Sequence, residues 1–186
     1  MKKQKKSISV FAMILFTILF FLSVNVLGES YYPPPPDKNK TLPATDGGPD
    51  GCNSSRFKCV MGGEAILDKQ TGLTWSRNVH IANVAKPWQE AVKFCKDLEI
   101  GDRKGWRLPT KEELITILDT SQSDPALPAG HPFKNVGGIR EWKTVWTGTV
   151  YEGNSNSAYI IALYTGRVSD ELKLFDYHIW PVLSEN

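Results

Sequence analysis

The residues best suited to recognition chemistry in this chain are aromatic and amide side chains that gather in its last third. Tryptophan and tyrosine rings can stack on sugar rings or on apolar peptide groups, and asparagine amides can hydrogen-bond to hydroxyl or backbone groups. Alternating aromatic residues in a strand can also fill a core, an interpretation that stays open for Trp146 and Tyr159. The candidate ligand-binding residues are Trp142, Tyr151, Asn154 and Asn156.

Residue types that catalyse reactions or bind metals are present but form no recognisable set. The histidines His80, His131 and His178 are widely spaced and no CxxC pair accompanies them, so nothing indicates a zinc site. The sequence has no GxSxG, GxGxxG or phosphate-binding loop motif. Glu112 and Glu113 are adjacent on a predicted helix and point in different directions, so they do not converge as an acid–base pair. We expect no catalytic residues, no metal and no cofactor, and therefore a protein that is not an enzyme.

Two charged residues admit both a functional and a structural interpretation. Arg107 could contact an anion, or its five N–H donors could brace the interior against Glu113 or Glu141. We favour the brace, because a guanidinium group suits internal pairing with a carboxylate. Asp68 lies beside a predicted turn, and we expect it to accept backbone N–H groups from residues 71 or 72 of that turn.

The chain has three cysteines, Cys52, Cys59 and Cys95, which allow at most one intramolecular disulfide. Cys52 and Cys59 flank a short polar stretch that can bend back, so we expect these two residues to pair. Cys95 falls within a predicted helix, where we expect a small buried free thiol. Disulfides persist outside the cytoplasm, in agreement with the N-terminal sequence described next.

The N-terminal residues indicate export. Residues 1–28 join a lysine-rich start to an apolar run, which is typical of a secretory signal peptide. An uncleaved N-terminal anchor is the alternative, because residues 8–27 are about long enough to span a bilayer. Residues 29–51 are rich in proline and glycine and predict a linker, and residues 52–186 predict the folded domain. We expect an extracytoplasmic protein, secreted or periplasmic, whose only membrane contact would be an uncleaved N-terminal segment.

The charge balance argues against nucleic acid as a partner. The 186 residues carry a formal net charge of +2, but four lysines lie within residues 1–28. The rest of the chain has 18 basic and 20 acidic residues, which is nearly neutral. A nucleic-acid-binding domain usually carries a basic surface, so this class is disfavoured.

The order of predicted elements favours an α+β fold over a βαβ winding. Apolar periodicity predicts a helix over residues 87–98, with Pro87 at its start. A second helix is expected over residues 110–119, where Thr110 and Glu113 form a capping box. Of the tryptophans, we assign Trp75, Trp88, Trp106 and Trp180 to the core. Strands are predicted at residues 57–61, 65–68, 73–75, 144–151, 158–163 and 177–182.

An ordered set of segments resembles a known family. The most specific stretch is WRLPTKEEL at residues 106–114. The matching segments are Ala65–Trp75, Trp88–Cys95, Gly105–Leu114, Pro125–Pro128, His131–Phe133, Val145–Thr149 and Ile179–Val182. Together they resemble the Lcl C-terminal domain family, named after the C-terminal domain of a bacterial collagen-like adhesin, over roughly residues 56–182.

The resemblance implies a C-type-lectin-like α+β fold with antiparallel strands, two helices and a long irregular loop region. The adhesin's domain is associated with sulfated glycosaminoglycans, a ligand that does not transfer safely to this slightly acidic chain. Many members have a cysteine near position 180 that can pair with the cysteine of the first helix. Its absence here implies that Cys95 is unpaired. Gly148 replaces a small polar residue usual in the family, which weakens a ligand role for that segment.

These observations predict an exported, non-catalytic binding module that recognises a glycan or another cell-surface or envelope partner, as in adhesion. The WRLPT stretch also resembles relatives of the formylglycine-generating enzyme, so an enzyme of that type is one alternative. A structural envelope protein without a ligand is the other.

Overall fold

A computed structural model describes residues 51–137 and 143–184. The signal segment and nearly all of the linker predicted from the sequence lie outside the described residues. The described chain opens with an antiparallel meander of β1 (Phe57–Val60), β2 (Ala65–Asp68) and β3 (Leu73–Ser76), as predicted. The short helix η1 (Met61–Gly63) joins the first two strands, and Gly62 and Gly63 both take the left-handed conformation that this turn needs.

The C-terminal residues complete this sheet. Strand β7 (Val182–Ser184) pairs antiparallel with β3, so the strand order is β1-β2-β3-β7. The predicted strand at residues 177–182 was wrong in its bounds, because only Val182 of that range lies in β7. Tyr177 and His178 instead make single bridges to Lys86 and Val145. The segment before β7 thus connects the two sheets rather than forming a strand.

A second sheet contains β4 (Thr144–Val150), β5 (Ser157–Ala162) and β6 (Arg167–Leu172), in that order. All pairings are antiparallel, with an irregular register between Trp146 and Val150. Strand β6 was not predicted, because its sequence RVSDEL is polar and all six residues are exposed or only half-buried. It forms by pairing along its whole length with β5, whose sequence SAYIIA has the apolar content that β6 lacks.

The two predicted helices are present and shorter than expected. Helix α2 (Trp88–Asp97) begins after Pro87 and buries Ala91 and Cys95. Helix α3 (Lys111–Ile117) begins at the predicted capping box: Thr110 Oγ1 accepts from the Glu113 N–H at 3.1 Å, and Glu113 Oε2 accepts from the Thr110 N–H at 2.8 Å. The hydroxyl of Thr149 accepts a further helix N–H, from Lys111, so β4 also caps the helix.

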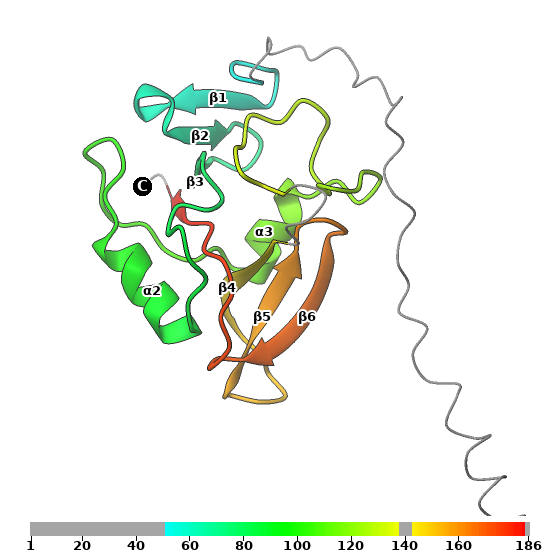
Figure 1. Ribbon diagram of the computed structural model, residues 1–186. Coiled ribbons are helices and arrows are strands. Elements are labelled where there is room, and N and C mark those ends of the chain that lie inside the picture. Colours follow the sequence, from blue (N-terminus) through cyan, green and yellow to red (C-terminus); the bar gives the residue numbers. More distant parts are fainter. Residues whose placement is uncertain (1–50, 138–142, 185–186) are drawn as a thin grey trace, which may run out of the picture. The chain divides into compact units, whose positions relative to one another are not determined.

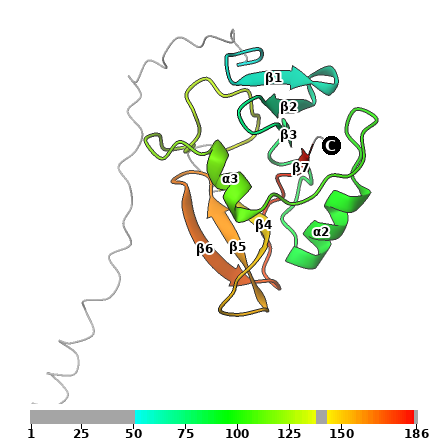
Figure 2. The ribbon, with the colours of Figure 1, turned by 180° about the vertical axis from the view of Figure 1, so that it is seen from behind.

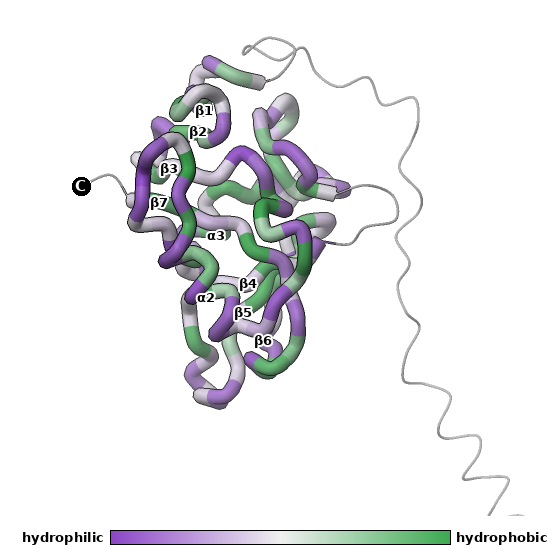
Figure 3. Tube along the Cα trace, turned by 60° about the vertical axis from the view of Figure 1, so that its left-hand side comes forward, coloured by the Kyte–Doolittle hydropathy of each residue, from purple (hydrophilic) through white to green (hydrophobic). Residues whose placement is uncertain are grey.

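Helix α3 covers one face of the three-stranded sheet. It lies behind this sheet in Figure 1 and in front of it when the molecule is turned (Figure 2). Leu114 and Ile117 of α3 share a core cluster with Ile161 of β5. This cluster continues to Trp75 of β3 and to Trp180 in the segment before β7. A second cluster joins Ala91 and Cys95 of α2 to Trp146, Ala158 and Ile160 on the opposite face. Figure 3 shows hydrophobic and hydrophilic segments alternating over short distances, as expected of short elements that each bury one side.

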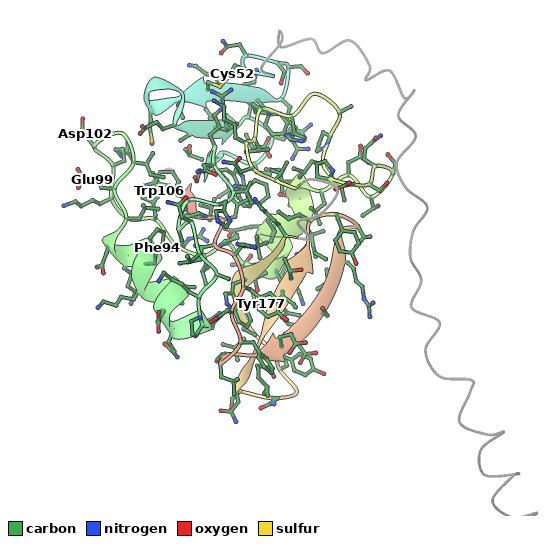
Figure 4. The ribbon with its side chains drawn as sticks, in the orientation of Figure 1. Cys52, Phe94, Glu99, Asp102, Trp106 and Tyr177 are labelled. Carbon is green, nitrogen blue, oxygen red and sulfur yellow. A yellow bond between two sulfur atoms is a disulfide. The ribbon has the colours of Figure 1, made fainter. Side chains whose placement is uncertain are left out.

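The loop after α2 turns from solvent back into the interior. Glu99 and Asp102 lie along its outer part, whereas Trp106 at its base is 1% exposed (Figure 4). Trp75, Trp106 and Trp180 are fully buried, as predicted, whereas Trp88 is half-buried. The two helices and two antiparallel sheets confirm the predicted α+β class. The finer assignment to C-type-lectin-like folds stays a prediction.

Candidate functional site

The hairpin that joins β4 to β5 carries three of the four candidate ligand-binding residues, at the lower end of the sheet in Figure 1. Its turn is held by backbone bonds, in which Tyr151 N donates to Ser157 O and Asn154 N donates to Tyr151 O. The Asn154 side chain accepts from Asn156 N at 3.0 Å and donates to Ser157 Oγ at 3.3 Å. Asn154 therefore shapes the turn, while the side chain of Asn156 is exposed.

Tyr151 and Tyr159 form an aromatic pair at the base of this hairpin. Their ring centroids are 5.4 Å apart with an interplanar angle of 85°, an edge-to-face contact that aromatic pairs prefer. Both residues are half-buried. Gly153 makes room for the pair, because a Cβ added there would lie 2.6–2.8 Å from the ring and hydroxyl of Tyr151. The glycine thus allows the Tyr151 ring to rest against the hairpin backbone.

Charged side chains complete what we call the tyrosine surface, made of Tyr151, Tyr159, Lys111 and Glu152. The Tyr159 hydroxyl donates to Glu152 Oε2 at 2.6 Å. This hydrogen bond lowers the pKa of the Glu152 carboxyl and raises the pKa of the Tyr159 phenol. The Lys111 ammonium lies over the Tyr159 ring, 4.1 Å from its centroid, in a cation–π contact. The surface therefore presents aromatic rings, a carboxylate and an ammonium side by side.

Two other aromatic residues were singled out from the sequence, and the structure describes one of them. Trp142 lies in residues 138–142, outside the described residues. Trp146, which the sequence left open between core and surface, is fully buried, and its Nε1 donates to Lys86 O at 2.9 Å. It packs edge-on against Tyr177, labelled beside the three-stranded sheet in Figure 4. Trp146 is thus a core residue.

Arg107 pairs with Glu113, as favoured from the sequence, although the Arg107 side chain is 38% exposed and not buried. Its guanidinium binds both carboxylate oxygens of Glu113 at 2.7 Å and also donates to Ser184 Oγ. The hydrogen bond from Arg107 lowers the pKa of Glu113, and the same bond raises the pKa of Arg107. Because Glu113 also closes the capping box, this pair ties the start of α3 to the chain beside β7.

Asp68 is also structural, and it accepts the expected N–H groups through its backbone carbonyl. Its side chain is completely buried and pairs with Arg56, with nitrogen–oxygen distances of 3.0 and 2.8 Å. The carboxylate accepts from Gln70 N, whereas the N–H groups of Thr71 and Gly72 bond to the Asp68 backbone carbonyl. A buried carboxylate needs a charged partner, and Arg56 lay beyond the local turn that the sequence analysis considered.

The cysteines behave as predicted. Cys52 and Cys59 form a disulfide, and Cys95 is a buried free thiol whose pKa is raised by burial to about 12. A thiol with such a pKa stays protonated at neutral pH and is a poor nucleophile. Across residues 51–137 and 143–184, no three His, Cys, Asp or Glu side chains lie where they could share a metal ion. The same residues include no helix of the length and apolarity that a membrane span requires.

Sequence reasoning missed two members of the tyrosine surface, Lys111 and Glu152. Glu152 follows a candidate residue directly, so its place in the turn was a usable signal. Lys111 is forty residues away from Tyr151 in the sequence, and nothing in the local pattern joins the two. The packing of α3 on β4 and β5 brings Lys111 to the hairpin.

The comparisons with known proteins agree with the resemblance seen in the sequence. No curated protein matches the chain. Residues 64–183, which run from the residue before β2 into β7 and include the whole tyrosine surface, match the family described as the Lcl C-terminal domain. Because this match covers well over half of the sequence, the chain belongs to the Lcl C-terminal domain family.

Proposed function

We propose that this protein is an extracytoplasmic, non-catalytic binding module that recognises a glycan or a cell-surface partner through the tyrosine surface. The observation that carries the proposal is the half-buried Tyr151–Tyr159 pair, held by Gly153, Glu152 and Lys111 at the hairpin end of the three-stranded sheet. Rigid elements position recognition groups better than free loops do. The aromatic pair is thus pre-arranged for contact with a ligand.

The compartment and the cysteines support the same proposal. The Cys52–Cys59 disulfide fits a domain that folds in an oxidising environment, as does membership in a family named after an adhesin. Cys95 is a poor candidate for the catalytic thiol of a formylglycine-generating-type enzyme, because it is buried and its pKa is about 12. A site of this size predicts weak binding for one copy and a gain from multivalent display.

A binding assay on an array of immobilised molecules tests the proposal. The full-length protein, purified in a sugar-free detergent, is passed over immobilised saccharides and extracellular or cell-surface proteins. We expect binding without chemical change of the bound molecule, and loss of that binding in the variant Trp142→Ala/Tyr151→Ala. Phe175→Ala is the matched control, because Phe175 is an aromatic residue outside the tyrosine surface with 46% of its area exposed.

Two outcomes would contradict the proposal. Binding that survives Trp142→Ala/Tyr151→Ala with an unchanged melting temperature would place the site elsewhere. Turnover of any array component that depends on a thiol or a metal would reject the non-catalytic class.

A further inference from the structure

We infer that the ligand of the tyrosine surface is a neutral, hydroxyl-rich saccharide and not an anionic glycan. This inference rests on the proposed function and adds the ligand class to it. The argument depends on which charged groups at the surface are already engaged and which remain open to a ligand.

The two ammonium groups near the hairpin are both engaged within the chain. Lys111 Nζ lies over the Tyr159 ring and is 3.4 Å from a Glu112 carboxylate oxygen. Lys173 Nζ donates to Ser155 O at 2.7 Å and lies 4.5 Å from the centroid of a Trp88 ring. An anionic ligand would have to compete with these internal contacts for each ammonium group.

The carboxylates, in contrast, keep capacity to accept hydrogen bonds. Glu152 accepts the Tyr159 hydroxyl through one oxygen, and an ionised carboxylate can accept about four hydrogen bonds. Asp170 is exposed and is the register partner of Tyr159 on β6, so the two side chains leave the same side of the sheet. With Glu112, these acids outnumber the cations around the pair, which repels sulfates and uronates and suits hydroxyl donors.

The rings complete the match to a saccharide. Lys111 lies over one side of the Tyr159 ring, so we assign the stacking contact with the ligand to Tyr151. Its position against Gly153 fixes the ring before a ligand arrives, which lowers the ordering cost of binding. The exposed amide of Asn156, on the same hairpin, adds both donors and an acceptor for hydroxyl groups. Ring stacking with a shell of hydroxyl partners is the chemistry of a neutral sugar site.

The test compares neutral with anionic probes on the full-length protein in a sugar-free detergent. The neutral probes are hexasaccharides of glucose, mannose and N-acetylglucosamine, and the anionic probes are heparin and polygalacturonate fragments of the same length. We expect binding to at least one neutral probe. Because a neutral ligand is not screened, its affinity should stay within about twofold between about 50 and 500 mM NaCl.

Variants locate the site. Tyr151→Ala should weaken the neutral probe roughly tenfold, the size of one lost aromatic contact, whereas Tyr151→Phe should retain most of the affinity. Gly153→Ala should also weaken binding, because the added Cβ displaces the Tyr151 ring without removing it. Phe175→Ala should leave affinity unchanged. The melting temperature of each variant shows whether its fold is intact. If Tyr151→Ala does not fold, Gly153→Ala is used in its place to test the site.

Three results would overturn this inference. Exclusive binding of the anionic probes, weakened by salt, would leave the proposed function standing with a different ligand. Binding of array proteins but of no saccharide would also reject the saccharide as the ligand and leave the proposed function standing. Binding of nothing on either array would reject both the ligand class and the proposed function.

Discussion

The four-stranded sheet and the hairpin end of the three-stranded sheet use the same kinds of side chain for opposite purposes. In the first region, the Asp68 carboxylate is completely buried against Arg56, and Ser76 O accepts the indole N–H of Trp180, which lies in the segment before β7. In the second, the Glu152 carboxylate and the Tyr159 phenol bond to each other where both are open to solvent. Aromatic and acidic residues therefore indicate a role only once their burial is known.

This difference in burial predicts that the first region contributes to stability and the second to recognition. A buried charge that loses its partner has no water to replace it, whereas a solvent-exposed group can turn to water. Substitutions in the four-stranded sheet should therefore unfold the protein, and substitutions at the tyrosine surface should leave it folded. The following predictions test this contrast, in order of decreasing effect on the free energy of unfolding.

The largest effect is expected for Asp68→Ala. Removal of the carboxylate leaves Arg56 with its charge unpaired at a site where only 18% of its side chain is exposed. We expect a loss of about 3 kcal/mol or more in the free energy of unfolding, measured by urea denaturation. Asp170→Ala, at an exposed position of β6, is the control and should change it by less than about 0.5 kcal/mol. Equal effects of the two variants would contradict the contrast.

The disulfide comes next. Cys52→Ser/Cys59→Ser opens a short loop whose closure reduces the entropy of the unfolded chain. We expect a loss of about 2 kcal/mol in the same measurement. Wild-type protein in excess dithiothreitol should reach the stability of the variant. If reduction leaves the wild type unchanged, the disulfide does not stabilise the domain.

The cap of α3 predicts a smaller loss. Thr110→Ala removes the hydroxyl that accepts the Glu113 N–H and should cost about 1 kcal/mol. Thr110→Ser keeps the acceptor and should recover most of that stability. An unchanged denaturation midpoint and slope for Thr110→Ala would show that water replaces the cap.

This cap also shows which parts of the molecule the sequence could predict. Thr110 and Glu113 are three residues apart, so the signal and the contact both lie within one turn of helix. The Cys52–Cys59 pair and the turns of the opening meander likewise join residues that are close in the sequence. Local spacing determines these features, and the sequence predicted each of them.

Features that depend on distant partners were missed. Strand β6 is too polar to be recognised alone and is specified by β5. The charge of Asp68 is balanced by Arg56, which lies just before β1 and twelve residues away in the sequence. At the candidate site, Tyr151 and Asn156 were predicted, but Lys111 reaches the hairpin only through the packing of α3. The sequence of one segment carries no local signal of such contacts, because the partner residues lie far away along the chain.

The Arg107–Glu113 pair predicts how stability changes with acid. Its hydrogen bond holds the pKa of Glu113 below the ordinary value of 4.5, so the ionised carboxylate stabilises the folded state. This contribution is complete above pH 4.5 and is lost as pH falls through the lowered pKa. In a series of urea denaturations at different pH, Glu113→Gln should reduce the loss of unfolding free energy between neutral and acidic pH. Glu64→Gln, an exposed control with no described ion pair, should leave this loss unchanged. If the unfolding free energy of Glu113→Gln falls with pH as steeply as that of the wild type, other carboxylates cause the pH dependence.

The smallest effect on stability is expected for Tyr151→Ala, and it decides whether the hairpin is a recognition surface. The ring is half-buried, but it packs edge-to-face with Tyr159 and lies against Gly153 at the end of the sheet, and Tyr151 is a member of neither large core cluster. Its removal opens to solvent and creates no closed cavity, so we expect a loss of about 1 kcal/mol or less, against several for a buried aromatic residue. Trp146→Ala, at a fully buried position of β4, the strand that ends just before Tyr151, is the matched comparison and should cost at least about 3 kcal/mol. If both substitutions destabilise the protein equally, Tyr151 belongs to the core and the aromatic pair serves the fold; a large difference leaves the Tyr151 ring free to serve a ligand.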